Sequence, residues 1–248
     1  MAFHFIAISS SYSQGYRIGW HYSSEERLEL GVIQNFMKTV EKECGRLQFA
    51  VHKLSTDSTD FQSVISKDKF FEGIFTTSSV DSFIELLKMD KVLSASDIAK
   101  FILTIQPMSQ LKLQKILYYV YAEFLLKTGK KLFKEEFVAF QYGPVVKEIY
   151  HKYKKYGSSI IEEDEDDVFE LHARIPTPIS FMKVVSSEVG IEAVTSIIDT
   201  LEKYLGYSAS ELVTRTHRPQ GPWHQVYESY QNKVITDDII LKYHHVVV

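Results

Sequence analysis

Few residues in this chain could do chemistry, and their spacing matches no catalytic set. His217 lies in the segment THRPQGPW, six residues before Trp223, where an imidazole could shuttle a proton or contact a ligand. Alternatively, His217 hydrogen-bonds backbone groups and fixes a turn. Ser208 and Ser210 come shortly before this segment, but both fit helix caps better than nucleophiles. A hydrolase triad is therefore unsupported, and we expect none of these residues to be catalytic.

Metal ligands also lack useful spacing. The nine histidines form no HxxxH or HExxH pair, and His244 and His245 are adjacent, which suits chelation poorly. The single cysteine, Cys44, cannot form an intramolecular disulfide, so the sequence indicates a reducing compartment. We expect no metal and no cofactor.

Composition places the chain among folded proteins. Of its 248 residues, 45% are hydrophobic and 24% are charged, which predicts one large domain or two smaller ones. The formal net charge of −4 argues against a general nucleic-acid binder. The first residues, MAFHFIAISSSYSQ, do not resemble a signal peptide, and no run approaches the roughly 20 apolar residues of a membrane helix. We therefore expect a cytoplasmic protein that does not enter a membrane.

Residues 1–93 mix strand and helix patterns and predict a small α+β domain of unknown role. Segment 2–9, AFHFIAIS, is apolar on both faces, as in a buried strand. Within 23–44, Ser23 and Glu26 fit a capping box that would start a helix. The other predicted elements are strands in 16–20, 47–54 and 70–77 and a helix over 79–89.

Residues 94–248 predict a mainly α-helical domain, so that the whole chain is of the α+β class. A first helix would begin at Ser94 or Ser96. The next runs from Leu111 to Gly129 and carries two apolar stripes, which indicates a helix packed on two sides at the centre of its domain. We assign Lys112, Lys115 and Glu123 to its narrow polar sector.

Later helices have recognisable starting residues. Pro144 and Pro222 suit the first turn of a helix, because proline has no N–H to satisfy there. Ser208 with Glu211 forms a second capping box, and Thr236 fits an N-cap. After Pro144, helical spacing points Val146, Ile149, Tyr150 and Tyr153 inward and Lys147, His151, Lys154 and Lys155 outward.

Two charged groups and a set of tyrosines could bind a partner, and each has a simpler explanation. EEDEDD, residues 162–167, could engage a basic partner or be a solvated loop. Lys112, Lys115, Lys147, Lys154 and Lys155 could form a basic patch or an ordinary solvated face. The tyrosines between 118 and 153 could serve an interface or the core.

Four segments in order resemble one known family. They are LKLQKILYYVYAEFLLKTGKKLF (111–133), FVAFQYGPVVKEIYHKYKKYG (137–157), YSASELVTRTHRPQGPWHQVYE (207–228) and ITDDIILKYH (235–244). Residues from about 94 to 245 are thereby similar to the SocA-like antitoxin family, the Panacea domain of bacterial and phage toxin–antitoxin systems. The resemblance says nothing about residues 1–93.

The resemblance implies a domain that neutralises a toxin encoded beside it, usually by direct binding and in one member through delivery to a protease. It implies no enzymatic activity. The residues that match the family motifs are candidates for partner binding or for holding the fold: Lys112, Gln114, Lys115, Tyr118, Tyr142, Gly143, Pro144, Val145, Thr216, His217, Pro222 and Trp223.

Two other functions remain open. One is a phage-encoded inhibitor or proteolytic adaptor that acts on a host protein. The other is an enzyme that uses His217 with a carboxylate. In the leading interpretation the partner is a cognate toxin protein, and residues 1–93 add specificity for it.

Overall fold

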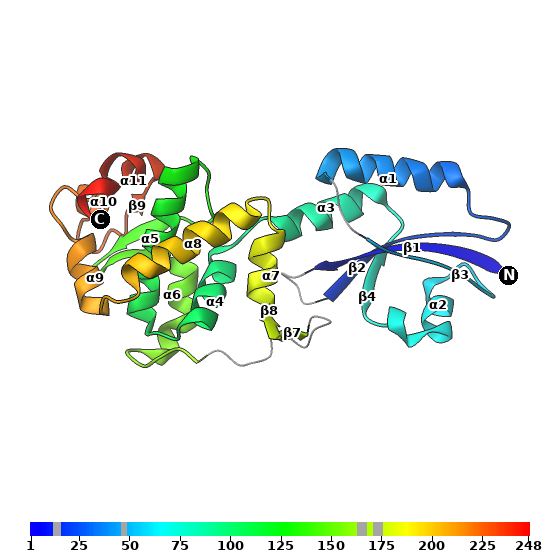
Figure 1. The fold of residues 1–248 in the computed structure, drawn as a ribbon, viewed down its shortest axis with the longest axis horizontal. Helices are drawn as coiled ribbons and strands as arrows, with labels where there is room; N and C mark the ends of the chain where they lie inside the picture. The colour runs from blue at the N-terminus through cyan, green and yellow to red at the C-terminus, as the bar shows by residue number, and fades with distance from the viewer. Residues whose placement is uncertain (12–15, 46–48, 163–167, 171–175) are drawn as a thin grey trace. The chain divides into compact units, whose positions relative to one another are not determined.

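The computed structural model describes residues 1–11, 16–45, 49–162, 168–170 and 176–248 (Figure 1). Within them the chain divides into two compact units, Met1–Lys91 and Val92–Val248. Both contain helices and strands, so the α+β class predicted from the sequence is confirmed. That the units are independent domains, with a boundary near residue 93, stays a prediction.

The N-terminal unit is built on a four-stranded sheet in the order β3-β1-β2-β4. Strand β1 pairs antiparallel with both β2 and β3, and β2 pairs parallel with β4. The elements are β1 (Ala2–Ser11), β2 (Tyr16–Ser24), α1 (Leu30–Cys44), β3 (Ala50–Thr56), α2 (Phe61–Lys67), η1 (Lys69–Phe71), β4 (Ile74–Thr77) and α3 (Val80–Lys91).

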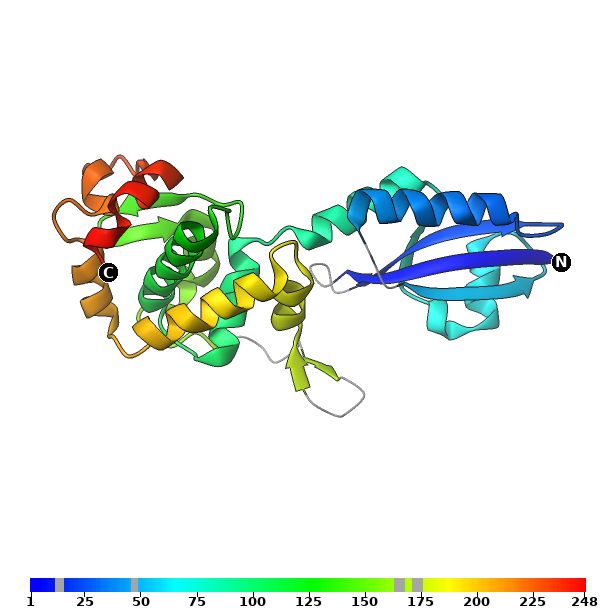
Figure 2. The same ribbon diagram turned by 45° about the horizontal axis from the view of Figure 1, so that its top comes forward.

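Helices cover both faces of this sheet, with α1 and α3 on one face and α2 on the other (Figures 1 and 2). Phe5 of β1 packs in the apolar cluster under α1 and α3, together with Trp20 and Phe36. Ile6, the next residue of β1, belongs to the cluster on the α2 side. The prediction of a strand buried on both faces is therefore confirmed.

The predicted start of the first helix is wrong. Strand β2 continues through Ser24, which pairs with Phe3, and α1 begins only at Leu30. Ser23 donates its hydroxyl to Thr59 O, 3.0 Å away, instead of capping a helix. The sheet ladder thus outcompetes the local capping pattern of Ser23 and Glu26.

The C-terminal unit is mainly helical. Its elements are α4 (Ala95–Ile105), α5 (Gln110–Thr128), β5 (Phe137–Phe140), β6 (Gly143–Val146), α6 (Lys147–Tyr153), η2 (Lys154–Tyr156), β7 (Val168–Glu170), β8 (Pro176–Pro178), α7 (Ile179–Ser186), α8 (Gly190–Tyr204), α9 (Ala209–Thr216), α10 (Pro222–Val226), β9 (Val234–Ile235), α11 (Asp237–Tyr243) and η3 (His244–Val246). Of the segment EEDEDD, residues 163–167 lie outside the described part of the chain.

Helix α5 is the centre of this unit, as its two apolar stripes predict (Figure 2). It packs against α4, α8, α9, α11 and the strand β6. It ends at Gly129, whose φ of 70° is the left-handed conformation that glycine adopts readily. One assignment is corrected, because Lys115 does not lie on a polar face but is fully buried.

Pro144 does not start a helix. It lies in β6, at the edge of a three-stranded sheet ordered β6-β5-β9, and α6 begins at Lys147. Proline is tolerated in an edge strand because its missing N–H is not needed for pairing. The other predicted starts are confirmed: Ser94 and Ser208 form capping boxes with Asp97 and Glu211, Pro222 lies in the first turn of α10, and Thr236 caps α11.

Candidate functional site

The family-like motifs meet at one β-hairpin, formed by β5, the residues Gln141 and Tyr142, and β6. Gly143 closes the turn with a φ of 103°. A Cβ atom at this position would lie 2.8 Å from Thr216 Oγ1 and 2.9 Å from Lys115 Nζ. Both the backbone conformation and the close neighbours therefore require glycine here.

Two side chains of α5 bind the backbone of β6. Lys115 donates from Nζ to Pro144 O at 2.7 Å. The amide of Gln114 makes two bonds to Val146: its Nε2 donates to Val146 O at 3.2 Å, and its Oε1 accepts from Val146 N at 2.9 Å. Helix α5 thus fixes the outer side of the hairpin through buried hydrogen bonds.

Lys115 is unusual because its ammonium group is fully buried. Burial disfavours the charged form and lowers the pKa of Lys115 from 10.5 to about 7. No carboxylate of the described residues forms an ion pair with it. At neutral pH the amine is therefore partly unprotonated while its hydrogen bond to Pro144 persists.

The corner between α9 and α10 binds the other strand and the turn. Trp223 donates from Nε1 to Phe140 O at 2.8 Å. His217 Nδ1 lies 2.7 Å from Val213 O, and His217 Nε2 lies 3.1 Å from Gln141 O. The His217 and Trp223 rings meet edge to face, with centroids 3.8 Å apart. His217 therefore contacts backbone carbonyls, as the turn-fixing interpretation predicts. Burial lowers the pKa of this imidazole, although the two carbonyls act to raise it.

Most of the predicted site residues take part in this arrangement. Gln114, Lys115, Thr216, His217 and Trp223 surround the hairpin; Gly143, Pro144 and Val145 are its buried second strand; and Pro222 is buried at the start of α10. Tyr142 differs from all of them, because it is 60% exposed at the tip. Which of these residues contact a partner stays a prediction.

Lys112 and Tyr118 lie elsewhere on α5. Lys112 donates from Nζ to Leu205 O at 2.7 Å, at the C-terminal end of α8, where a cation is favourable. Because Lys112 is held there and Lys115 is buried, the proposed basic patch of five lysines does not form. Lys147, Lys154 and Lys155 remain exposed.

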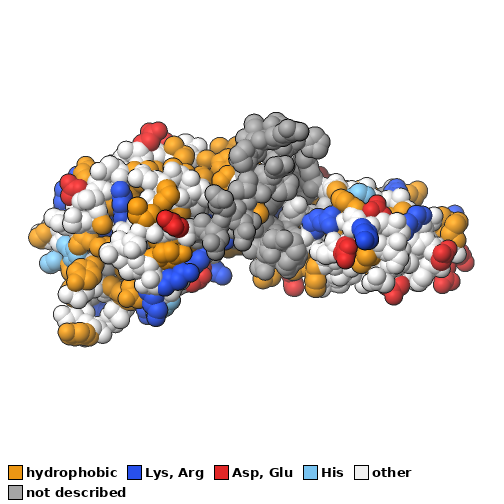
Figure 3. Space-filling model, turned by 90° about the horizontal axis from the view of Figure 1, so that it is seen from below, with side chains coloured by type: hydrophobic (Ala, Val, Ile, Leu, Met, Phe, Trp, Pro, Cys, Tyr) orange, Lys and Arg blue, Asp and Glu red, His pale blue; other side chains and the backbone are white. Residues whose placement is uncertain are grey.

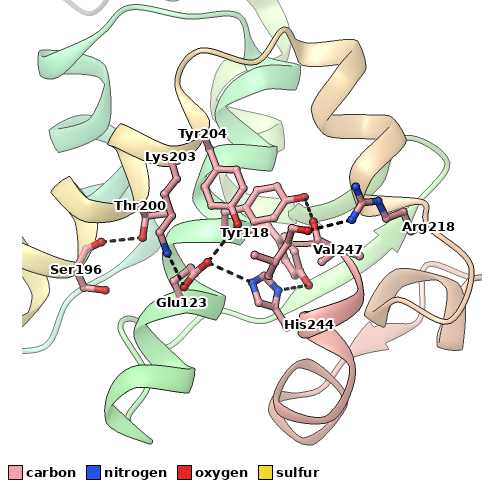
Figure 4. A network of polar contacts seen from close by, with 11 residues as sticks. Tyr118, Glu123, Ser196, Thr200, Lys203, Tyr204, Arg218, His244 and Val247 are labelled. Atoms are coloured by element: carbon pink, nitrogen blue, oxygen red, sulfur yellow. Dashed lines mark hydrogen bonds and ion pairs between the residues drawn. The ribbon is translucent and has the colours of Figure 1, made fainter.

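Tyr118 joins a polar network that the sequence did not predict (Figure 4). Its hydroxyl lies 3.2 Å from His244 Nδ1, and His244 Nε2 lies 3.9 Å from Glu123 Oε1. Glu123 also accepts from Tyr204 OH at 3.2 Å. Interactions with His244, Lys203 and Tyr204 lower the pKa of Glu123 to about 2.

Arg218 ties the last residues of the chain into the same region. It donates from Nη1 to Val246 O at 3.1 Å and to Val248 O at 3.0 Å, while Tyr119 donates its hydroxyl to Val247 O at 3.0 Å. These partners are separated by 28 residues or more along the chain. Of these contacts, the sequence indicated only that α5 is rich in aromatic residues.

The hairpin cluster holds backbone groups in place and has no arrangement typical of catalysis. Its buried donors face main-chain carbonyls. The hydroxyl of Thr216 donates to Val213 O within its own helix. In the described part of the chain, no three histidine, cysteine or acidic side chains are grouped as metal ligands. Among the helices of the described residues, none has the length and apolar character to cross a membrane.

Comparison with known proteins supports the family resemblance. Residues 113–224 match the family described as "Antitoxin SocA-like, Panacea domain". The chain is also similar to Antitoxin SocA of Caulobacter vibrioides, with 31% identity over 120 residues, which are 47% of this chain and 58% of that protein. The chain thus spans little more than half the length of this curated relative.

The predicted resemblance is therefore confirmed for the stretch that contains α5, the hairpin and the corner around Trp223. Residues 1–93 lie outside the match. No solved structure matches the chain.

Proposed function

We propose that this protein is an antitoxin that neutralises a cognate toxin by direct binding. The observation that carries the proposal is the match to the SocA-like antitoxin family over 113–224, the residues whose side chains surround the β5–β6 hairpin. The match to this family supports the coarser part of the proposal, a role in a toxin–antitoxin system. Direct binding is the finer step.

Physical chemistry favours a binding role for the hairpin. Besides the main-chain pairing of its strands, the hairpin is fixed by hydrogen bonds between its main-chain groups and side chains of α5, of α10 and of the residue that caps α9, so the loop is held in one conformation. A preorganised loop loses little conformational entropy when it binds. An arrangement of this kind suits recognition of a folded partner surface.

The test is co-expression with the product of the adjacent gene. If that product stops growth when expressed alone, we expect this chain to restore growth and to co-purify with it in a stable complex. A specific complex of this kind buries about 1,600 Å² in total. An empty vector is the negative control.

Three other results would change the conclusion. Rescue that requires a cellular protease, with loss of the toxin from the cell, would replace direct neutralisation by an adaptor mechanism. Absence of a toxic neighbour, with no rescue of any toxin tried, would contradict the antitoxin role and favour an inhibitor of a host protein. Rescue without a complex, combined with loss of rescue in His217→Ala, would favour enzymatic action.

A further inference from the structure

Two tyrosines extend beyond the same end of the β5–β9 ladder. Val138 of β5 pairs with Val234 of β9, and Ala139 N donates to Lys233 O at 2.8 Å. Tyr142 lies four residues after Val138, and Tyr230 lies four residues before Val234. The hairpin turn and the loop before β9 therefore leave the sheet at the same end of its strands. We call Gln141, Tyr142, Tyr230, Gln231 and Asn232 the tyrosine tip.

Both tyrosines are unusually accessible. Tyr142 is 60% exposed and Tyr230 is fully exposed, whereas the other tyrosines whose exposure the structure describes are buried or half-buried. Tyrosine combines a large apolar surface with a hydroxyl and only two side-chain torsions, so it gains contact area at low entropic cost. Solvent exposure of both rings leaves that contact area unused in the free chain.

The backbone around the tip is strained. Among the described residues, three other than glycine have a positive φ: Gln220 at 69°, Tyr230 at 65° and Asn232 at 47°. All three lie in the loops on either side of α10, whose Trp223 binds Phe140 of the hairpin. Strain of this kind persists where surrounding structure imposes it, and it is frequent at binding sites.

The tip carries no net charge. Its five residues are uncharged, and the nearest charged side chains in sequence, Glu228 and Lys233, pair with each other. A different surface, on α6 and η2, carries the exposed lysines Lys147, Lys152, Lys154 and Lys155 beside one acidic residue, Glu148. Lysine and arginine side chains gather in more than one place on the face shown in Figure 3. An acidic partner would select the basic surface, whereas the tip fits an uncharged one.

We infer that Tyr142 and Tyr230 are the anchors through which this chain contacts its toxin, and that the contacted toxin surface is uncharged and accepts two aromatic rings. The inference rests on the proposed antitoxin function. A few central aromatic residues usually dominate the binding energy of an interface, and tyrosine is prominent among them. Clamping by Lys115, His217 and Trp223 would hold the Tyr142 side of the tip ready for binding.

The experiment measures binding of the full chain to the toxin encoded by the adjacent gene, purified from the complex under denaturing conditions and refolded. The variants are Tyr142→Ala, Tyr230→Ala and both together. Ile191→Ala, at a 77% exposed position of α8, is the matched control for loss of exposed apolar surface. The double change Lys154→Glu with Lys155→Glu tests the basic surface.

We expect each tyrosine variant to raise Kd at least tenfold and the double variant at least 100-fold, with unchanged thermal unfolding. Tyr142→Phe should retain most of the affinity if the ring provides the contact. Ile191→Ala and the lysine variant should bind like the parent. Because the tip is uncharged, Kd should change less than threefold between 50 and 500 mM NaCl.

Failures of the two proposals give different results. A parent chain that neither rescues growth nor binds the toxin contradicts the antitoxin function itself. A parent chain that does both, with tyrosine variants that bind within threefold of it, contradicts the tyrosine tip while the function stands. Loss of binding in the lysine variant, with strong salt dependence, would assign the contact to α6 and η2 instead.

Discussion

Lys115 makes the folding of this protein depend on pH in an unusual direction. Its pKa is about 7 in the folded chain and near 10.5 when unfolded, so the unfolded state binds more protons between these values. The free energy of unfolding should therefore rise with pH over this range. From pH 7 to pH 9 the expected gain is about 2 kcal/mol.

Urea unfolding of the full chain at pH 7 and pH 9 measures this gain. Lys115→Met keeps the length of the side chain without an ionisable group, so its unfolding free energy should change much less between the two pH values. His217 is a titratable neighbour of Lys115, and burial lowers its pKa, away from this interval. Equal pH dependence in parent and variant would show that the buried amine does not titrate as described.

Trp223 combines packing with a hydrogen bond, and the two contributions can be separated. It is 8% exposed, and its Nε1 binds Phe140 O. Trp223→Ala should lower the unfolding free energy by about 3–5 kcal/mol, because it removes a buried ring. Trp223→Phe keeps an aromatic ring but removes the hydrogen bond, so it should lower the unfolding free energy by less than Trp223→Ala does. A Trp223→Ala chain that melts like the parent but no longer binds its partner would make Trp223 a contact residue.

At the level of elements, the β5–β6 hairpin depends on a glycine with neighbours on two sides. Gly143→Ala forces a Cβ against Thr216 and Lys115 as well as an unfavourable φ. Gly129→Ala is the matched control, since Gly129 also has a positive φ but nothing within 4 Å of the added atom. The control should lose roughly 1–2 kcal/mol from its backbone alone.

Gly143→Ala should therefore lose clearly more stability than Gly129→Ala, measured by thermal unfolding of both variants. Growth rescue should fall with it if the hairpin presents the contact residues. Similar stability of the two variants would mean that Lys115 and Thr216 move aside without penalty, and that the hairpin tolerates a wider turn.

Local signals predicted the helices better than the sheet. Capping boxes at Ser94 and Ser208 and the glycine after α5 act over three or four residues, so the sequence shows them directly. Pro144 fits a helix start and an edge strand equally well, and only its pairing with Ala139 decides between them. Local spacing predicts a cap at Ser23, because the extension of β2 depends on pairing with Phe3 of another strand.

The candidate site was predicted as a set of residues but not as an arrangement. Motif resemblance selected Gln114, Lys115, His217 and Trp223, which do meet at the hairpin. Helical periodicity places Lys115 on a polar face, because periodicity cannot show that a carbonyl 29 residues away accepts a hydrogen bond from it. Tyr230 was missed because its loop matches no motif and its φ is visible only in the structure.

For the whole molecule, the division at residues 91 and 92 can be tested with a protease. Helix α3 ends at Lys91 and α4 begins at Ala95, so only a short connection joins the two compact units. We expect limited trypsin digestion to cut after Lys91 and leave a fragment that begins at Val92. Absence of a preferred cut between residues 88 and 96, under conditions that cut elsewhere, would count against independent domains.

The edge of β6 limits what else can bind this sheet. In an antiparallel pair, alternate residues of an edge strand point their polar backbone groups away from the neighbour, and in β6 these residues are Pro144 and Val146. Pro144 has no N–H, and its carbonyl accepts a hydrogen bond from Lys115. The N–H and the carbonyl of Val146 are both hydrogen-bonded to the side chain of Gln114. No outward group of β6 is left to template a new strand, so the hairpin is protected from edge-to-edge aggregation and cannot recruit an extended peptide by strand addition.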